Sequence, residues 1–385
     1  MNNDNYNHTS GKPNKYIVFV ILAVSLAGLI YSFSKPVGKD VIGGIVKDVL
    51  SERETTLDIG NKNKIVKEQE LLVEITVEKE KKDIKVLNDF IPVAAGDKIF
   101  VRGSLFGDSE FNIVDISRTK ELILLSVFFV MLVLLTSGWK GFYSLIGLLF
   151  SFAVIFVFMV PQILKGSGPV TIGLIGSAMI LVPTLYLSYG LNKKTIAAFL
   201  GIILALLFVG ISASFVVDVI QFSGLSEVSI FLDMETSNSI NFLGLLIAGI
   251  IIAAVGVLDD VAVVQSSTVF GLASVSSNLR GFKLFRKAMA VGKDHISAVV
   301  NTLVLAYTGA ALPLILLLSL RGMSADYFVS IEIVAEEIVR TLISSSGLLL
   351  AVPLTTIIAT FMVGKSYQSV TETSNLSKNG AGKTP

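Results

Sequence analysis

The sequence contains no cysteine and only two histidines among its 385 residues. Without cysteine the chain has no disulfide, no thiol nucleophile and no iron–sulfur cluster. His8 lies in a polar stretch and His295 in a charged one, so neither a histidine-based metal site nor a buried Ser-His-Asp triad is expected. No Gly-rich phosphate motif precedes a Lys-Ser or Lys-Thr pair, which argues against ATP-driven action. We therefore expect no enzyme activity, no metal and no cofactor.

Charged residues are scarce as well, at 16% of the chain against about 25% in soluble domains. They gather in clusters, and between the clusters lie apolar runs of about 18 residues or more, long enough to cross a hydrocarbon core of ~30 Å. Apolar residues make up 52% of the chain. These features predict a polytopic membrane protein in contact with membrane lipid. The net charge of +1 gives no general case for nucleic-acid binding.

The chain divides into segments of contrasting composition. Residues 1–14 are polar and predict a disordered tail, whereas 15–34 are apolar and predict an uncleaved signal-anchor helix. Residues 35–121 are rich in Lys and Glu and alternate in polarity, which predicts a small all-β domain. Residues 122–365 predict a bundle of seven membrane helices, and residues 366–385 predict a second disordered tail.

The alternation in the β segment has period two. In "LVEITVEKEKKDIKVLND", Val73, Ile75 and Val77 face one way and the residues between them face the other. In "VAAGDKIFVRG" a turn precedes a strand, in which we expect Ile99 and Val101 to point inward. Short strands without helical periodicity predict a barrel or a sandwich.

Seven spans are expected in the bundle. They lie at residues 122–138, 141–164, 169–191, 195–217, 242–265, 296–320 and 341–363. With the signal anchor, the fold class is an all-α membrane protein of eight transmembrane helices, with the β domain between helices 1 and 2. Lys and Arg gather in loops on the side of the N-terminal tail. The positive-inside rule therefore predicts that both termini are cytoplasmic and that the β domain is extracytoplasmic.

Two adjacent acids interrupt the apolar stretch "AVGVLDDVAVVQ". Asp259 and Asp260 are the only charged side chains between Glu235 and Arg280. An Asp at the centre of a membrane helix costs ~2.5–3.5 kcal/mol on the insertion scale. Such acids facing a bundle interior suit a carrier of protons, and Asn301 on the next span is a candidate partner in a relay. The alternative is that both acids mark the inner interface, with Asn301 acting only as interhelical glue.

The depth of the acid pair stays open at this stage. If the membrane segment begins near Phe242, the pair lies at its cytoplasmic end, and if it begins near Gly249, the pair lies near the midplane. The same span carries Gly244, Gly249 and Gly256, which predict close helix packing because small residues let helices approach.

A basic segment follows the acidic span. Residues 279–292 (LRGFKLFRKAMAVG) place apolar side chains at helical spacing, which predicts an amphipathic helix on the inner leaflet. Its expected membrane-surface cluster comprises Arg280, Lys283, Arg286 and Lys287. The alternative is a charged loop that only fixes the topology.

The stretches "GVLDDVAVVQSSTVFGL" and "AVGKDHISAVVNTLVLAYTGAALPLILLL" carry a resemblance. With the N-terminal anchor and the β-rich segment, they resemble the YibE/F-like family of bacterial membrane proteins. This resemblance implies a multi-pass plasma-membrane protein and supplies no catalytic residues. "GVLDDVAVV" alone is also similar to a span of resistance-nodulation-division exporters, in which an adjacent Asp pair carries protons. Eight spans and the lack of an intramembrane Lys depart from that pattern.

Two functions follow from these observations. The first is a proton-coupled secondary transporter or exporter component that uses Asp259 and Asp260. The second is a non-catalytic envelope scaffold or assembly protein that acts through its β domain, with an extracytoplasmic protein partner or as a homo-oligomer. An intramembrane aspartyl protease is disfavoured, because adjacent residues on one helix cannot converge on one water.

Overall fold

The structure is a computed structural model that divides into two compact units. It describes residues 14–33, 41–59, 62–77, 80–89, 91–103, 111–224, 240–276, 278–320, 322 and 324–380. One unit is Phe33–Gly138, and the other combines Met1–Ser32 with Trp139–Pro385. The expected N-terminal tail lies almost wholly outside the described residues.

The first unit contains a small closed β-barrel. Its strands are β1 (Val41–Ile59), β2 (Lys62–Val77), β3 (Glu80–Asn88), β4 (Lys98–Arg102) and β5 (Phe111–Ile116). Val73, Ile75, Ile99 and Val101 are almost completely buried inside the barrel. The predicted β domain is therefore confirmed, and so is the inward direction of these four side chains.

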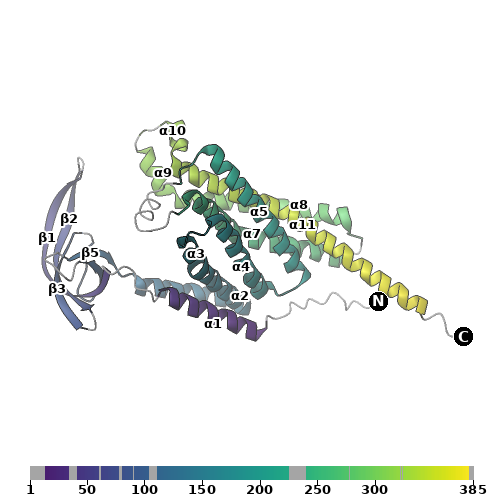
Figure 1. Ribbon diagram of the computed structural model, residues 1–385, viewed down its shortest axis with the longest axis horizontal. Helices are drawn as coiled ribbons and strands as arrows, with labels where there is room; N and C mark the ends of the chain where they lie inside the picture. Colours follow the sequence, from purple (N-terminus) through teal and green to yellow (C-terminus); the bar gives the residue numbers. More distant parts are fainter. Residues whose placement is uncertain are drawn as a thin grey trace. The chain divides into compact units, whose positions relative to one another are not determined.

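The strand order around the barrel is β1-β2-β3-β5-β4. Strand β1 pairs with both β2 and β4 in antiparallel fashion, while β3 and β5 form a short parallel pair. A five-stranded barrel with this order has the topology of the OB-fold. The β1–β2 hairpin is longer than the barrel, because its pairing continues from Gln69 out to Ile59 and Lys62, where β3 no longer accompanies it (Figure 1).

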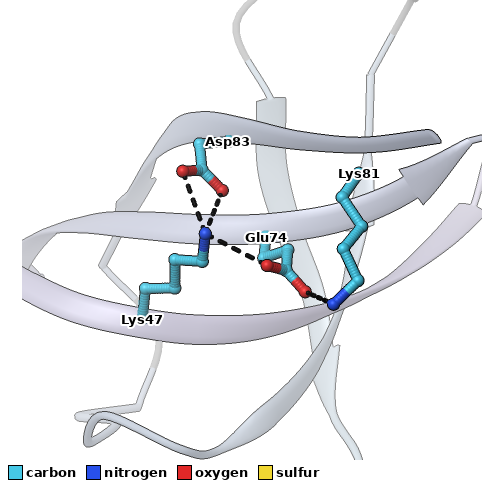
Figure 2. Close-up of polar contacts among 4 residues, drawn as sticks. All are labelled: Lys47, Glu74, Lys81 and Asp83. Atoms are coloured by element: carbon cyan, nitrogen blue, oxygen red, sulfur yellow. Dashed lines mark hydrogen bonds and ion pairs between the residues drawn. The ribbon is translucent and has the colours of Figure 1, made fainter.

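The outer face of β1, β2 and β3 carries a network of ion pairs, shown in Figure 2. Lys47 Nζ lies 2.8 Å from Asp83 Oδ1 and 3.0 Å from Glu74 Oε2. Lys81 Nζ lies 2.7 Å from Glu74 Oε1. Two lysines therefore share two carboxylates across three strands, and the face neutralises its own charge.

This network predicts a pH dependence of the barrel. Lys81 and then Lys47 hold the pKa of Glu74 below its ordinary value of 4.5. A carboxyl whose pKa is lowered by folding stabilises the fold above its unfolded pKa, and that contribution disappears as the pH falls through the folded pKa. We expect hydrogen-exchange protection of the β1–β3 amides to fall below about pH 4.5. Glu74→Gln should flatten this fall.

The matched control is Glu80→Gln, which changes an exposed acid that makes no ion pair among the described residues. It should keep the wild-type pH profile. Identical profiles for Glu74→Gln and the wild type would contradict the assigned role of the network.

The second unit is helical. Its elements are α1 (Lys15–Phe33), the later part of α2 (Thr119–Ala153), the π-helix η2 (Val154–Met159), α3 (Val160–Leu164), α4 (Pro169–Tyr189), α5 (Lys193–Ile220), α7 (Phe242–Val275), α8 (Gly281–Ala310), α9 (Leu312–Ser319), α10 (Ala325–Ser330) and α11 (Glu332–Gly380). Helix α11 extends to Gly380, into the segment for which a disordered tail was predicted.

Six helical stretches among the described residues are long and apolar enough to cross a membrane, so the chain is a membrane protein but the expected count of eight spans is not confirmed. The predicted spans 122–138 and 141–164 fall in one stretch, Thr119–Leu164. The predicted span 296–320 is divided between α8 and α9 by a break at Ala311, and neither part has the required length and hydropathy.

Helix α7 lies at the centre of the helical unit and packs against α4, α5, α8 and α11 (Figure 1). Contacts near both ends fix the helix directions. Gly244 lies beside Pro169, which starts α4, so α4 and α7 run parallel. Ser344 and Thr356 of α11 meet Ile250 and Gln265 of α7 in the same order. Helices α4, α7 and α11 therefore run in the same direction.

Helices α5 and α8 run against α7. Gly210 of α5 lies beside Ile251, while the start of α5 meets Ser266. Arg280, just before α8, bonds the Ala273 carbonyl near the end of α7, whereas Gly292, further along α8, lies beside Gln265, which comes earlier in α7. The direction therefore alternates from α4 to α5 to α7 to α8 and again to α11, as in an up-and-down helix bundle.

Only one of the three predicted packing glycines lies at a helix contact. A Cβ added to Gly244 would meet Pro169 Cδ at 3.2 Å, but a Cβ added to Gly249 or Gly256 would meet nothing within 4 Å. The prediction for Gly249 and Gly256 is wrong, because both lie off the faces of α7 that meet other helices. The closest approach instead joins Gly201 of α5 to Thr355 of α11.

These contacts predict opposite effects of the same substitution at two glycines. Gly201→Val should lower the thermal unfolding temperature of the protein in lipid nanodiscs, because the new side chain overlaps Thr355 and overpacking costs about 1–3 kcal/mol. Gly249→Val should unfold close to the wild-type temperature. Circular dichroism follows the thermal unfolding of both variants. Equal unfolding temperatures would contradict this packing.

Candidate functional site

The acid pair lies in the second half of α7. Asn241 caps the helix by accepting a hydrogen bond from the Gly244 amide at 2.8 Å, so the helix starts at Phe242. Asp259 follows 17 residues later (259 − 242), about 26 Å along the axis at ~1.5 Å per residue. The helix therefore starts before Gly249, and the acid pair lies just beyond the middle of α7.

The other end of α7 provides a second reference for depth. Ser266 Oγ donates a hydrogen bond of 2.8 Å to the Lys194 carbonyl oxygen at the start of α5. Asp259 precedes Ser266 by seven residues, which is about 10 Å along the helix. The pair therefore lies about 10 Å along α7 from the level of Lys194, on the side towards the start of α7.

The two acids have different surroundings. Asp259 is partly buried, and its Oδ1 atom is enclosed and makes no hydrogen bond in the part of the chain that the structure describes. Asp260 is exposed on the surface of the bundle. Residues seven apart share a helix face, so Asp259 points to the same side as Ser266, where α4 ends and α5 begins. The carboxyl that faces the interior is that of Asp259.

Few groups offset the charge of Asp259. The aromatic side chain of Tyr189, at the end of α4, lies within electrostatic range of both acids. No ion pair to either carboxylate is found among the described residues. An enclosed carboxylate oxygen without a hydrogen bond is costly in an apolar bundle. This position therefore suits a group that binds a proton or another small cation.

The turn that carries Tyr189 is held by Asn192. Asn192 Nδ2 donates a hydrogen bond of 2.8 Å to the Tyr189 carbonyl, and Asn192 Oδ1 accepts one of 3.0 Å from the Thr195 amide. Gly190 supplies the positive φ of 75° that reverses the chain. The end of α4 is thus fixed against the start of α5, beside the acid pair.

Asn301 is not brought to the acid pair. It is exposed on α8 and makes no side-chain hydrogen bond within the described residues. Its neighbour Thr302 bonds to the Ala298 carbonyl of the same helix at 3.0 Å. The structure thus supports neither a relay through Asn301 nor an interhelical hydrogen bond from it.

Buried hydrogen bonds that the sequence analysis missed join α7, α8 and α11 at Gln265, which follows the acid pair on α7. Gln265 Nε2 donates to Thr356 Oγ1 at 2.7 Å and to the Ala288 carbonyl at 3.1 Å. Thr356 in turn donates to the Val352 carbonyl at 2.6 Å. Gln265 ends the same motif that contains the acids, and its amide in an apolar stretch was the available signal.

The basic segment after α7 is helical, as predicted, but it is the start of the long helix α8 and not a separate helix ending at residue 292. Leu284 and Ala288 are buried against α5, α7 and α11. Lys283, Arg286 and Lys287 are exposed. The amphipathic face therefore packs on the bundle, and the charges point away from it.

Arg280 has a different role from the other three basic residues. Its Nη1 donates to the carbonyl oxygens of Leu279 at 2.8 Å and Ala273 at 3.0 Å. A longer bond of 3.4 Å reaches Ser276. Ala273 lies in the last turn of α7 and Ser276 is its C-cap, whereas Leu279 lies in the turn before α8. Its place in a lipid-facing cluster is therefore corrected to that of a helix cap.

This role predicts that Arg280→Met destabilises the protein in nanodiscs by about 1–3 kcal/mol, because hydrogen bonds from a charged group to buried carbonyls are lost. Lys283→Met, at an exposed site on the same helix, should leave the unfolding temperature unchanged. Thermal melting curves of both variants, recorded without guanidinium, measure the difference. An unchanged unfolding temperature of Arg280→Met would refute the capping role.

Comparisons with known proteins place the chain by sequence. The family model described as YibE/F-like protein matches residues 125–365, which include every helix around the acid pair. The similarity to resistance-nodulation-division exporters is not confirmed. No curated protein and no solved structure matches the chain.

Proposed function

The chain belongs to the YibE/F-like family, and we propose that it is a proton-coupled secondary transporter or exporter component of the bacterial plasma membrane. It has eight spans and two cytoplasmic termini, and its β-barrel is extracytoplasmic. It is not an enzyme and needs no cofactor. Its surroundings are membrane lipid, with an extracytoplasmic protein or a second copy as a further partner.

Two features support eight spans over six. The stretch Thr119–Leu164 has 46 residues, or about 69 Å of helix, which is more than twice a hydrocarbon core of ~30 Å. Its helical path breaks at Gly138, where φ is 54° and ψ is −136°. The later half of α8 and α9 together supply a further crossing, since α8 runs against α7 and α11 runs with it.

The observation that carries the proton-coupled role is the enclosed, unpaired Oδ1 of Asp259 in the central helix of the bundle. A carboxyl there can hold a proton while shielded and release it when the surrounding helices move apart. Its distance of about 10 Å from the level of Lys194 is short enough for a brief opening to reach water. Acids facing the interior of membrane bundles commonly mark ion pathways.

This role predicts the effect of one conservative change. In proteoliposomes loaded with a pH-sensitive dye, an imposed proton gradient should acidify the lumen faster with wild-type protein than with lipid alone. Asp259→Asn should lower this protein-dependent rate at least tenfold, because the amide cannot exchange a proton. Asp260→Asn should have a smaller effect, since Asp260 faces outward.

Asp294→Asn is the matched control, because it makes the same change at an exposed position of α8. It should acidify the lumen at the wild-type rate. Wild-type rates for Asp259→Asn, or no rate above that of lipid alone for the wild type, would overturn the proposal.

A non-catalytic scaffold role is the alternative. It is favoured by the OB-fold topology of the barrel, because that topology occurs in binding modules. In this case deletion of residues 41–116 abolishes function in cells while Asp259→Asn is tolerated. The transporter role requires the loss of function with Asp259→Asn.

A further inference from the structure

The outer surface of the barrel has a regular grid of six positions on three neighbouring strands, and five of them carry a side chain. Ile45 of β1 pairs with Lys98 of β4 on one side and with Glu74 of β2 on the other. The next outward-facing position of β1 is Gly43, which pairs with Phe100. Since Gly44 pairs with Ile75, the position beside Gly43 on β2 is that of Thr76.

The grid has a gap at its centre because glycine occupies the middle of the second row. The gap forms a hollow of about 250 Å³ lined by Gly43, Ile45, Glu74, Thr76, Lys98 and Phe100. Two inter-strand steps of about 4.8 Å separate β4 from β2, so the hollow is roughly 10 Å across. Drug-sized ligands occupy about 300–1,000 Å³, so this space suits a single small ring.

Phe100 does not fill the gap. In many sheets an aromatic ring folds over the glycine on the neighbouring strand and protects its backbone. Here a Cβ added to Gly43 would meet nothing within 4 Å, so the ring does not lie over Gly43. Phe100 is 40% exposed and Ile45 is 43% exposed. The ring is therefore available at the rim of the hollow.

The Glu74 carboxylate and the backbone at Lys98, both at the hollow, are held in place. Glu74 is fixed by Lys47 at 3.0 Å and by Lys81 at 2.7 Å, both from outside the hollow. The backbone at Lys98 is held by the Ser117 amide, which donates to the Lys98 carbonyl at 2.8 Å. Thr76 adds a hydroxyl. An aromatic rim with a carboxylate, an ammonium and a hydroxyl around a glycine floor is a set of groups that can bind a ring with many hydroxyls.

We propose that the Gly43 hollow binds one ring of an uncharged oligosaccharide, with the ring stacked beside Phe100 and its hydroxyls bonded to Glu74, Thr76 and Lys98. The electron-rich face of Phe100 attracts the C–H groups of a sugar. A nucleic acid fits poorly here, because the Glu74 carboxylate lies at the hollow and two neighbouring lysines, Lys47 and Lys81, are already paired with acids.

The test uses the full chain in lipid nanodiscs, which avoid detergents with sugar headgroups. Isothermal titration with chitotetraose and with maltotetraose should show saturable binding of at least one of them. Gly43→Val should weaken that binding at least tenfold, because its side chain occupies the hollow. The substitution should not unfold the barrel, because the added atoms enter open space and β-branched residues suit strands.

Two further variants separate the hollow from general surface effects. Phe100→Ala should weaken binding at least tenfold, whereas Leu87→Ala, which removes a side chain 55% exposed on β3, should bind as the wild type does. The proposal is overturned if neither tetrasaccharide binds, if Gly43→Val binds as tightly as the wild type, or if a ten-residue oligothymidine binds and Gly43→Val abolishes it. The proton-flux measurement is independent of each of these outcomes.

Discussion

An apolar helix bundle must satisfy its polar groups from within, and this requirement shapes the region around α7. Gln265 is bonded to α8 and α11, Ser266 to the first turn of α5, and Ser344 of α11 to the Ile250 carbonyl. Arg280 bonds the carbonyls at the end of the helix. The enclosed oxygen of Asp259 has no hydrogen bond among the described residues, and neither have the buried hydroxyls of Ser345, Thr355 and Thr360 on α11. Under the proposed transporter role, this carboxyl is the group that binds the proton.

The same packing limits how that acid can work. Gly244 brings α7 close to the start of α4, and Gly201 brings α5 close to α11, so the helices around Asp259 pack tightly against one another. The end of α4 is held by Asn192, and the end of α7 by Arg280. Under the proposed transporter role, a proton path to Asp259 requires these helix ends to move together. Rigid movement of helices around a fixed acid is the usual form of alternating access.

Sequence reasoning succeeded where one residue's chemistry or a local period decided the outcome. Alternation identified Val73, Ile75, Ile99 and Val101 as the barrel interior, because a strand has two faces whatever its neighbours are. The acid pair was evident because two charges stand alone in an apolar stretch. Which acid is enclosed depends on where α4 and α5 lie, and that is a tertiary property. Whether a small residue lies at a helix contact is also a tertiary property, and Gly249 and Gly256 lie at none.

The central claim is that Asp259 lies inside the bundle, away from water, and the absence of cysteine makes a direct measurement possible. In inside-out vesicles, Asp259→Cys and Lys193→Cys each give the chain a single thiol, one beside α5 in the interior and one at an exposed position. A membrane-impermeant maleimide should label Lys193→Cys rapidly and Asp259→Cys at least tenfold more slowly. Equal labelling rates at the two positions would show that residue 259 faces cytoplasmic water and would contradict the account.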